Sequence, residues 1–210
     1  MIPGKAPSEY IQQEFIELLK SLYQAAQHYN DEVLLFIDPV HQVHNNENDY
    51  CWQFKGGGHT KTALANTGRR RLNIIGAINP VTLQPTAMLI EDNCCEEVIV
   101  AFLEEIKKQY SSATTICIIL DNARYQRAYS VQIRAKELGI SLIYLPPYCP
   151  NLNLIERLWR FFKKKVMKNK FYATFGEFEH SVGEFFVNFD QYLIQLKSLL
   201  SFKFGIIKAT

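Results

Sequence analysis

The stretch LPPYCPNLNLIERLW, residues 145–159, is the most informative part of this chain. It begins with a Pro-Pro pair, which disfavours regular structure. It continues into apolar residues at helical spacing, including Ile155, Leu158 and Trp159. The same spacing extends to Val166 and predicts a helix over residues 152–168, with Glu156 near its start.

Two upstream segments have the pattern of a buried strand that ends at an acidic residue. LLFID ends in Asp38, and IILDNAR carries Asp121 after an apolar run. Residues 122 to 155, 34 in number, separate Asp121 from Glu156. Each acidic residue also has a purely structural interpretation. Both aspartates are common in turns, and Asn153 with Glu156 three residues later could cap the helix, which contributes about 1 kcal/mol.

The remaining pattern is that of an α/β protein. Three early strands are predicted at 33–37, 71–78 and 86–90, and two later strands at 114–120 and 140–145. Helices are predicted at 94–110, 127–138, 152–168 and 175–196, with a short strand around 50–54. Another helix is predicted after Ser8, with an apolar side made of Tyr10, Phe15, Leu18, Leu19 and Leu22. The early strands favour antiparallel hairpins and the later ones parallel crossovers. We expect one mixed five-stranded sheet flanked by helices.

The strand order suggests where the acidic residues meet. If the first and fourth strands are neighbours, Asp38 and Asp121 leave them side by side, and the last helix brings Glu156 to the same edge. Three clustered carboxylates repel one another unless a cation joins them, and hard oxygen ligands suit Mg²⁺ or Mn²⁺. Two such ions can promote an in-line phosphoryl displacement. The pattern therefore indicates a metal-dependent phosphoryl-transfer site.

These motifs together resemble a known family. IILDNAR, the 34-residue spacing, LPPYCPNLNLIERLW, WQFKGGG and TGRRRLNIIGAINP are similar to the catalytic domain of DDE transposases of the mariner superfamily, in its bacterial insertion-sequence branch. The resemblance runs from about residue 3 to about residue 178. It implies an RNase H-like fold, with a leader and helix at 1–30, an endonuclease domain at 31–175 and a helical extension at 176–210.

The resemblance also implies an activity and partners. Asp38, Asp121 and Glu156 would bind two Mg²⁺ or Mn²⁺ ions for cleavage of transposon ends and strand transfer to a TA target. It implies a homodimer in the active complex, a helix-turn-helix polypeptide upstream, and action at the nucleoid of a bacterial cytoplasm. One departure is Gln126, where the family usually has histidine. Two alternatives are an inactive fragment that binds DNA or a partner, and an RNase H-like nuclease.

Basic residues gather in two places that favour DNA contact. The first set follows Glu156 and consists of Arg157, Arg160, Lys163, Lys164 and Lys168. All of these except Lys163 fall on one helical stripe. The second lies beside a glycine-rich segment: Arg69, Arg70 and Arg71. The alternative for both sets is a solvated charged surface. His41 and His44 fit solvent or DNA better than zinc, and Trp52 and Trp159 are predicted to be packing residues.

The bulk composition is that of an ordinary globular protein. The chain has 210 residues, 48% of them hydrophobic and 21% charged, with a net charge of +2. Nucleic-acid binding must therefore come from local basic patches. Five cysteines without a C-x-x-C pair favour reduced thiols over a disulfide framework or a zinc ribbon. The apolar runs are too short to cross a bilayer, so we expect a soluble cytoplasmic protein without a membrane partner.

Overall fold

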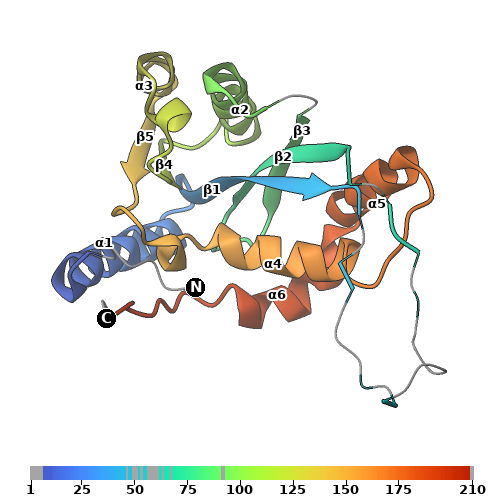
Figure 1. The fold of residues 1–210 in the computed structure, drawn as a ribbon. Helices are drawn as coiled ribbons and strands as arrows, with labels where there is room; N and C mark the ends of the chain where they lie inside the picture. The colour runs from blue at the N-terminus through green and yellow to red at the C-terminus, as the bar shows by residue number, and fades with distance from the viewer. Residues whose placement is uncertain are drawn as a thin grey trace.

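A five-stranded sheet lies at the centre of the computed structural model, which describes residues 7–45, 47–48, 52, 54–55, 62, 64–66, 68–90 and 93–208 (Figure 1). The strands are β1 (Glu32–Val43), β2 (Arg71–Ile78), β3 (Pro85–Ile90), β4 (Thr115–Leu120) and β5 (Ile140–Tyr144). The helices are α1 (Glu9–His28), α2 (Glu96–Gln109), α3 (Tyr129–Glu137), α4 (Ile155–Val166), α5 (Phe175–Val187) and α6 (Leu193–Leu199).

The sheet has the order β3-β2-β1-β4-β5 and contains both kinds of strand pairing. β1 pairs antiparallel with β2, and β2 with β3, whereas β1, β4 and β5 pair parallel through helical crossovers. The predicted mixed five-stranded α/β sheet is therefore confirmed. β1 and β4 are neighbours, which is the condition that the predicted site required.

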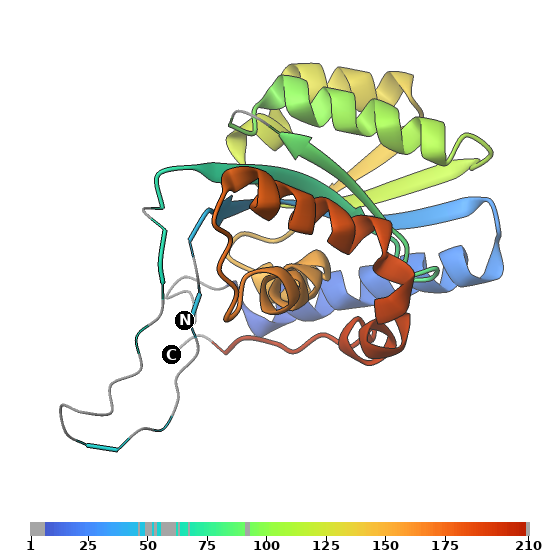
Figure 2. The ribbon, with the colours of Figure 1, turned by 90° about the vertical axis from the view of Figure 1, so that its right-hand side faces the viewer.

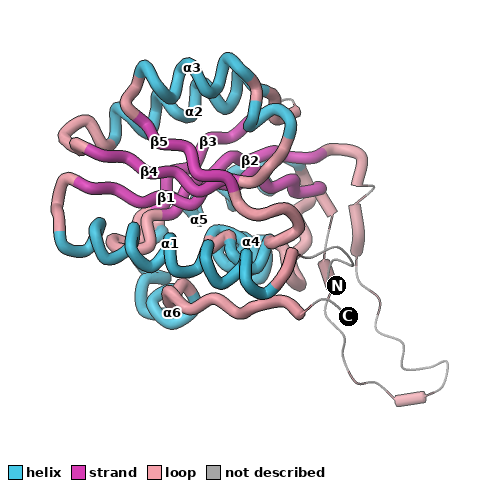
Figure 3. The backbone as a smooth tube through the Cα atoms, turned by 90° about the vertical axis from the view of Figure 1, so that its left-hand side faces the viewer, coloured by secondary structure: helices cyan, strands magenta, loops and turns pink. Residues whose placement is uncertain are grey.

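Helices cover both faces of the sheet (Figures 2 and 3). α2 and α3 pack on one face over a core that includes Leu35, Ile118 and Phe102. α1, α4, α5 and α6 pack on the other face, where the core includes Phe36 and Phe162. Successive strand residues alternate between these two cores, as the pleat requires. No helix among the described residues has the length and apolar composition needed to span a membrane.

β1 extends well beyond its predicted end. Asp38 was expected to leave the strand, but it lies inside β1, which continues through Pro39 to Val43. β4 pairs with β1 only as far as Phe36, so that edge of β1 is open farther along. A proline is tolerated at such an edge because no ladder hydrogen bond is lost there. The other edge stays paired with β2 up to Val43.

The predicted first helix is confirmed, and its predicted apolar side is right for Phe15, Leu19 and Leu22 but wrong for Tyr10 and Leu18. The Ser8 hydroxyl caps α1 by accepting a hydrogen bond from the amide of Ile11. Tyr10 and Leu18 are exposed, while Ile16 and Leu19 face the core. The buried side therefore follows the residues that point at the sheet rather than the largest apolar side chains.

The last predicted helix is two helices rather than one. α5 ends at Val187, a 3₁₀ turn covers Phe189–Tyr192, and α6 follows. The Asn188 side chain donates a hydrogen bond to the carbonyl of Glu184 and so ends α5. The break turns the chain so that Phe189 is buried in the core.

The predictions for the short strand and for the two tryptophans have different outcomes. The short strand predicted around 50–54 falls on Tyr50, Cys51 and Gln53, which lie outside the described residues. Trp52 was predicted to be a packing residue and is instead fully exposed. Trp159 is buried, as predicted.

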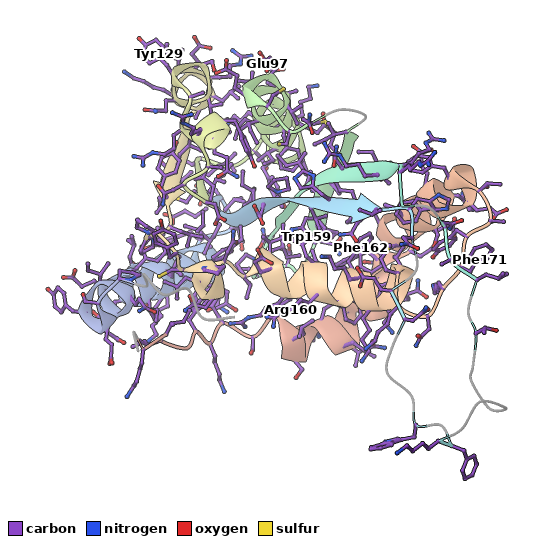
Figure 4. All side chains as sticks on the ribbon, in the orientation of Figure 1. Glu97, Tyr129, Trp159, Arg160, Phe162 and Phe171 are labelled. Carbon is purple, nitrogen blue, oxygen red and sulfur yellow. The ribbon has the colours of Figure 1, made fainter. Side chains whose placement is uncertain are left out.

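α4 packs against the sheet through a glycine. Gly76 in β2 is paired with Asp38 in β1, and a Cβ atom at Gly76 would lie 2.5 Å from Cη2 of Trp159. Real Cβ contacts are not this short, so only glycine lets the indole approach β2 this closely. Figure 4 shows Trp159 and Phe162 on the side of α4 that faces the sheet. Gly76 thus sets the distance between α4 and β1.

We expect Gly76→Ala to destabilise the protein by about 1–3 kcal/mol, because the added methyl group displaces Trp159. The melting temperature should fall by roughly 2–12 °C, as measured by circular dichroism. Gly183→Ala is the matched control, since a Cβ atom there meets no atom within 4 Å. That change should be neutral or stabilising in a helix. Equal melting temperatures for parent and Gly76→Ala would contradict the proposed packing constraint.

Candidate active site

The sheet register places the two aspartates side by side. Phe36 of β1 is paired with Ile119 of β4. Asp38 and Asp121 each lie two residues farther along, and side chains two apart share one face of a strand. Asp121 follows directly after the end of β4. Both carboxyl groups therefore point toward the face that α4 covers.

α4 supplies the third carboxyl group. Glu156 is in the first turn of α4, where a negative charge is favoured by the helix dipole. Trp159 is one turn farther along, so its packing on Gly76 also positions Glu156 over β1. The carboxyl groups of Asp38 and Glu156 lie close enough to influence each other's pKa.

Asn153 has a role different from the predicted helix cap. Leu154 occupies the cap position, without a side-chain capping bond. The Asn153 side chain is buried and donates to the carbonyl of Ile37 at 3.2 Å and to Oδ1 of Asp121 at 3.3 Å. It therefore joins β1, the end of β4 and the start of α4. The spacing Asn153–Glu156 gave no sign of this, because the partners are distant in sequence.

Burial raises the pKa of each acidic residue, and repulsion between carboxyl groups raises the pKa of Asp38 and of Glu156 further. Burial, followed by the charges of Asp121 and Glu156, raises the pKa of Asp38 to about 9. Burial also raises the pKa of Glu156, with a further contribution from Asp121 and opposition from Arg160 and Lys163. Burial raises the pKa of Asp121, against a hydrogen bond from Asn153. These three acids carry an electrostatic cost that a cation would relieve.

The donor set fits a hard divalent cation, since three carboxyl groups supply only oxygen ligands. Within the described part of the chain, no three His, Cys, Asp or Glu side chains already present their ligand atoms in a metal-binding arrangement. A protonated carboxyl group must release its proton to bind a cation, so metal binding by these residues would depend on pH.

A hollow beside Asp38 and Glu156 has cationic walls. Its volume is about 290 Å³, and His41, Arg160 and Lys163 contribute to its lining. Nδ1 of His41 lies 2.6 Å from Oδ1 of Asn73, which fixes the ring. His41 was predicted to face solvent or DNA and is exposed. Arg160 and Lys163 can neutralise a phosphate brought next to the carboxyl groups.

A second hollow, of about 100 Å³, lies beside Asp121. Its lining includes Asn122 and the loop Leu145–Pro150. The side chain of Asn122 donates a hydrogen bond to the carbonyl of Leu145 and accepts one from Arg127 at 3.2 Å. The three carboxyl groups thus stand between a cationic hollow and a proline-rich one.

The sequence motifs did not reveal a thiol and a phenol near the aspartates. Tyr125 lies beside Cys94, and burial, Cys95 and Asp38 raise the pKa of the Cys94 thiol to about 11. Burial, Cys94, Asp38 and Asp121 also raise the pKa of Tyr125. Cys94 comes from the segment before α2, so only the fold brings it here.

Gln126, which replaces the histidine usual in the family, is fully buried in a 3₁₀ turn. Neither its side-chain oxygen nor its nitrogen has a hydrogen-bond partner among the described residues. It therefore faces the interior rather than a solvated substrate. His44 is also packed inside, stacked on Phe178 and bonded to the carbonyl of Tyr172.

The predicted basic stripe is only partly present. Arg160, Lys163 and Lys164 lie on or near the surface of α4. Arg157 is half-buried and donates to the carbonyls of Ser201 and Lys203, so it holds the C-terminal segment instead.

Lys168 lies beyond the end of α4 and pairs with Glu47 in a short β-bridge. It therefore cannot continue the helical stripe.

The second predicted basic set is far from the carboxyl groups. Arg71 begins β2 five residues before Gly76, a distance of roughly 16 Å along a strand. Arg70 packs over the ring of Phe175 at 3.7 Å, and Arg71 donates to Asn93. Arg69 is exposed. DNA contact by this set stays a prediction.

A family model described as DDE superfamily endonuclease matches residues 33–179. The chain belongs to the DDE endonuclease superfamily. The match covers Asp38, Asp121 and Glu156 and confirms the family that the motifs predicted.

Two curated proteins are similar in sequence. The insertion element IS630 uncharacterized 39 kDa protein of Shigella sonnei is 25% identical over 142 residues, which are 67% of this chain and 38% of that protein. The uncharacterized protein y4pE/y4sA of Sinorhizobium fredii is 26% identical over 104 residues, which are 50% of this chain and 74% of that protein. The chain thus spans well under half the length of the IS630 protein.

The fold is that of the Mos1 mariner transposase catalytic domain. The crystal structure of that domain matches with a TM-score of 0.63 and 10% identity, covering 95% of this chain and 94% of the other. The Mos1 mariner paired end complex with Mn matches with a TM-score of 0.70 and 12% identity, over 95% of this chain and 63% of that one. The predicted RNase H-like architecture of this DDE family chain is confirmed.

The raised pKa of Asp38 predicts a pH-dependent stability. Its pKa in the folded protein, about 9, lies above the ordinary value of 3.8. Between these values the folded protein holds a proton that the unfolded chain has released. The free energy of unfolding of the metal-free protein should therefore fall as the pH rises through this range.

We expect Asp38→Asn to flatten this dependence and to raise the melting temperature by several degrees near pH 8 in EDTA. Thermal unfolding followed over a pH series measures both effects. Asp190→Asn, at an exposed aspartate, is the control and should leave the slope unchanged. A melting temperature that Asp38→Asn lowers at every pH would instead make this carboxyl group structural.

Proposed function

We propose that this chain is the catalytic domain of a transposase that cleaves DNA at transposon ends and transfers the strands to a TA target. The observation that carries the proposal is the meeting of Asp38, Asp121 and Glu156 on one face of the sheet. Their raised pKa values mark a site that needs a cation. Membership of the DDE endonuclease superfamily supports the same chemistry.

Asp38, Asp121 and Glu156 would hold two Mg²⁺ or Mn²⁺ ions. Asp38 interacts with both other carboxyl groups, so it would be the shared ligand. When bound, such ions activate a water or a 3′-hydroxyl and stabilise the leaving oxygen. The Mos1 mariner paired end complex has been solved with Mn and with Mg, which supports divalent metals here.

The chain's own residues position the DNA. Asn153 holds Asp121 toward the other carboxyl groups. Arg160 and Lys163 line the hollow beside Glu156 and can bind the phosphate flanking the reacting one. The buried floor made by Phe36, Ile119 and Trp159 limits water around the carboxyl groups.

The partners that we propose are transposon-end DNA, a second copy of the chain in the active complex and an upstream helix-turn-helix polypeptide. The solved Mos1 complexes include one with a left transposon end, which supports the DNA partner. The protein would act at the nucleoid in the bacterial cytoplasm.

Metal-dependent nicking of supercoiled plasmid tests the activity. We expect the parent to nick DNA with Mn²⁺ and not with EDTA, and Asp121→Asn to lose at least a hundredfold in rate. Mn²⁺ at about 100 times its Kd should raise the parent's melting temperature by roughly 5–10 °C and leave the variant's unmoved. Loss of stability in Asp121→Asn, together with no effect of Mn²⁺ on the parent, would make Asp121 a turn residue. Metal and DNA binding without nicking would favour a regulatory fragment.

Salt-dependent DNA binding tests the α4 surface. Each lost phosphate contact should reduce the slope of log K against log[salt] by about 0.9. The double variant Lys163→Ala, Lys164→Ala should therefore lose up to about two units in fluorescence anisotropy titrations. The control is Lys107→Ala, Lys108→Ala on α2, a pair with the same half-buried and exposed character. Equal slopes for the two double variants would assign the α4 surface to solvent.

A further inference from the structure

The loop Leu145–Pro150 contains a tyrosine in an unusual backbone conformation. Tyr148 has φ = 60°, in the left-handed region that favours glycine and asparagine. It is the second central residue of a turn whose first is Pro147. Turns with positive φ at this position normally carry glycine or asparagine there. A tyrosine is therefore unusual at this turn position.

Packing of the ring does not explain this departure, because Tyr148 is 56% exposed. A strained residue that gains little from burial is most often retained for a contact made outside the core. The backbone on both sides of Tyr148 is restricted, since Pro147 precedes it and Pro150 follows within two residues.

The loop is fixed directly beside the carboxyl groups. The amide of Leu145 donates to the carbonyl of Leu120 at 2.9 Å, and Asn122 donates to the carbonyl of Leu145. Cys149, next to Tyr148, is buried in the core. Tyr148 and Asp121 line the same hollow of about 100 Å³. An exposed aromatic ring thus stands at a fixed position next to a candidate metal ligand.

We propose that Tyr148 stacks on the nucleobase next to the phosphate that reacts at Asp38, Asp121 and Glu156. This inference rests on the proposed function. Aromatic stacking recognises any base through its π-face and therefore suits an unpaired or frayed strand end.

The arrangement of charge gives the strand its orientation. Cationic side chains of the other hollow, Arg160 and Lys163, bind the sugar-phosphate backbone. The lining of the hollow at Tyr148 includes Pro146, Pro147 and Pro150, which offer apolar surface to the base. A single strand crossing the carboxyl groups thus meets cations on one side and the ring on the other.

Two substitutions separate the ring from the backbone conformation. Tyr148→Asn removes the ring but keeps a residue that tolerates positive φ, so its melting temperature should match or exceed the parent's. Tyr148→Phe keeps the ring and removes only the hydroxyl group. The matched control is Tyr29→Asn, a tyrosine of similar exposure, 52%, at the opposite end of β1.

The probe is a DNA duplex with a 3′ overhang in which 2-aminopurine replaces one base at a time. With the parent and with Tyr148→Phe, one position should show quenched 2-aminopurine fluorescence. In Tyr148→Asn the quenching should disappear and the Kd should rise about tenfold. Mn²⁺-dependent nicking should fall in parallel, and Tyr29→Asn should behave as the parent does.

The outcomes distinguish this inference from the function on which it rests. If the parent nicks DNA and Tyr148→Asn shows the same quenching, Kd and rate, Tyr148 is not a stacking residue although the proposed function stands. If the parent neither binds nor nicks DNA, the proposed function fails and the stacking role fails with it.

Discussion

The contact between the Trp159 indole and Gly76 is the interaction on which the site depends. Gly76 lies opposite Asp38 in the β1–β2 ladder, and Trp159 lies one turn after Glu156 in α4. The missing side chain at Gly76 lets α4 approach the sheet closely, and this approach brings Glu156 to Asp38. Asn153 then connects the start of α4 to Ile37 and Asp121. The geometry of the carboxyl groups thus follows from packing several residues away.

This packing creates an electrostatic cost. Burial raises the pKa values of all three acids, and neighbouring carboxyl groups raise those of Asp38 and Glu156 further. Arg160 and Lys163 offset part of the remaining charge. Such an arrangement weakens the folded protein without metal and strengthens it with metal. The same groups that would bind a cation therefore oppose stability in its absence.

Much of the fold followed from the sequence, because its signals were local. Apolar periodicity identified β2, β4 and the stripe of α4, and Gly139, with φ of 69°, ended the helix before β5 as expected. The pairing of β1 with β4, left conditional by sequence, made the two aspartates neighbours.

The differences arose where distant contacts override local signals. Pro39 predicted a strand end, but the open edge of β1 accommodates it. Arg157 had the pattern of a surface cation, yet it binds carbonyls more than 40 residues away. Asn153 had the spacing of a helix cap and instead bonds to β1. No short window of sequence contains these partners.

An anomalous diffraction map from crystals soaked in Mn²⁺ tests the central claim most directly. We expect Mn²⁺ peaks in contact with the carboxyl oxygens of Asp38, Asp121 and Glu156. The same soak of Asp121→Asn crystals should show weaker peaks or none. Ordered crystals with Mn²⁺ bound only elsewhere would contradict a metal site at these three carboxyl groups.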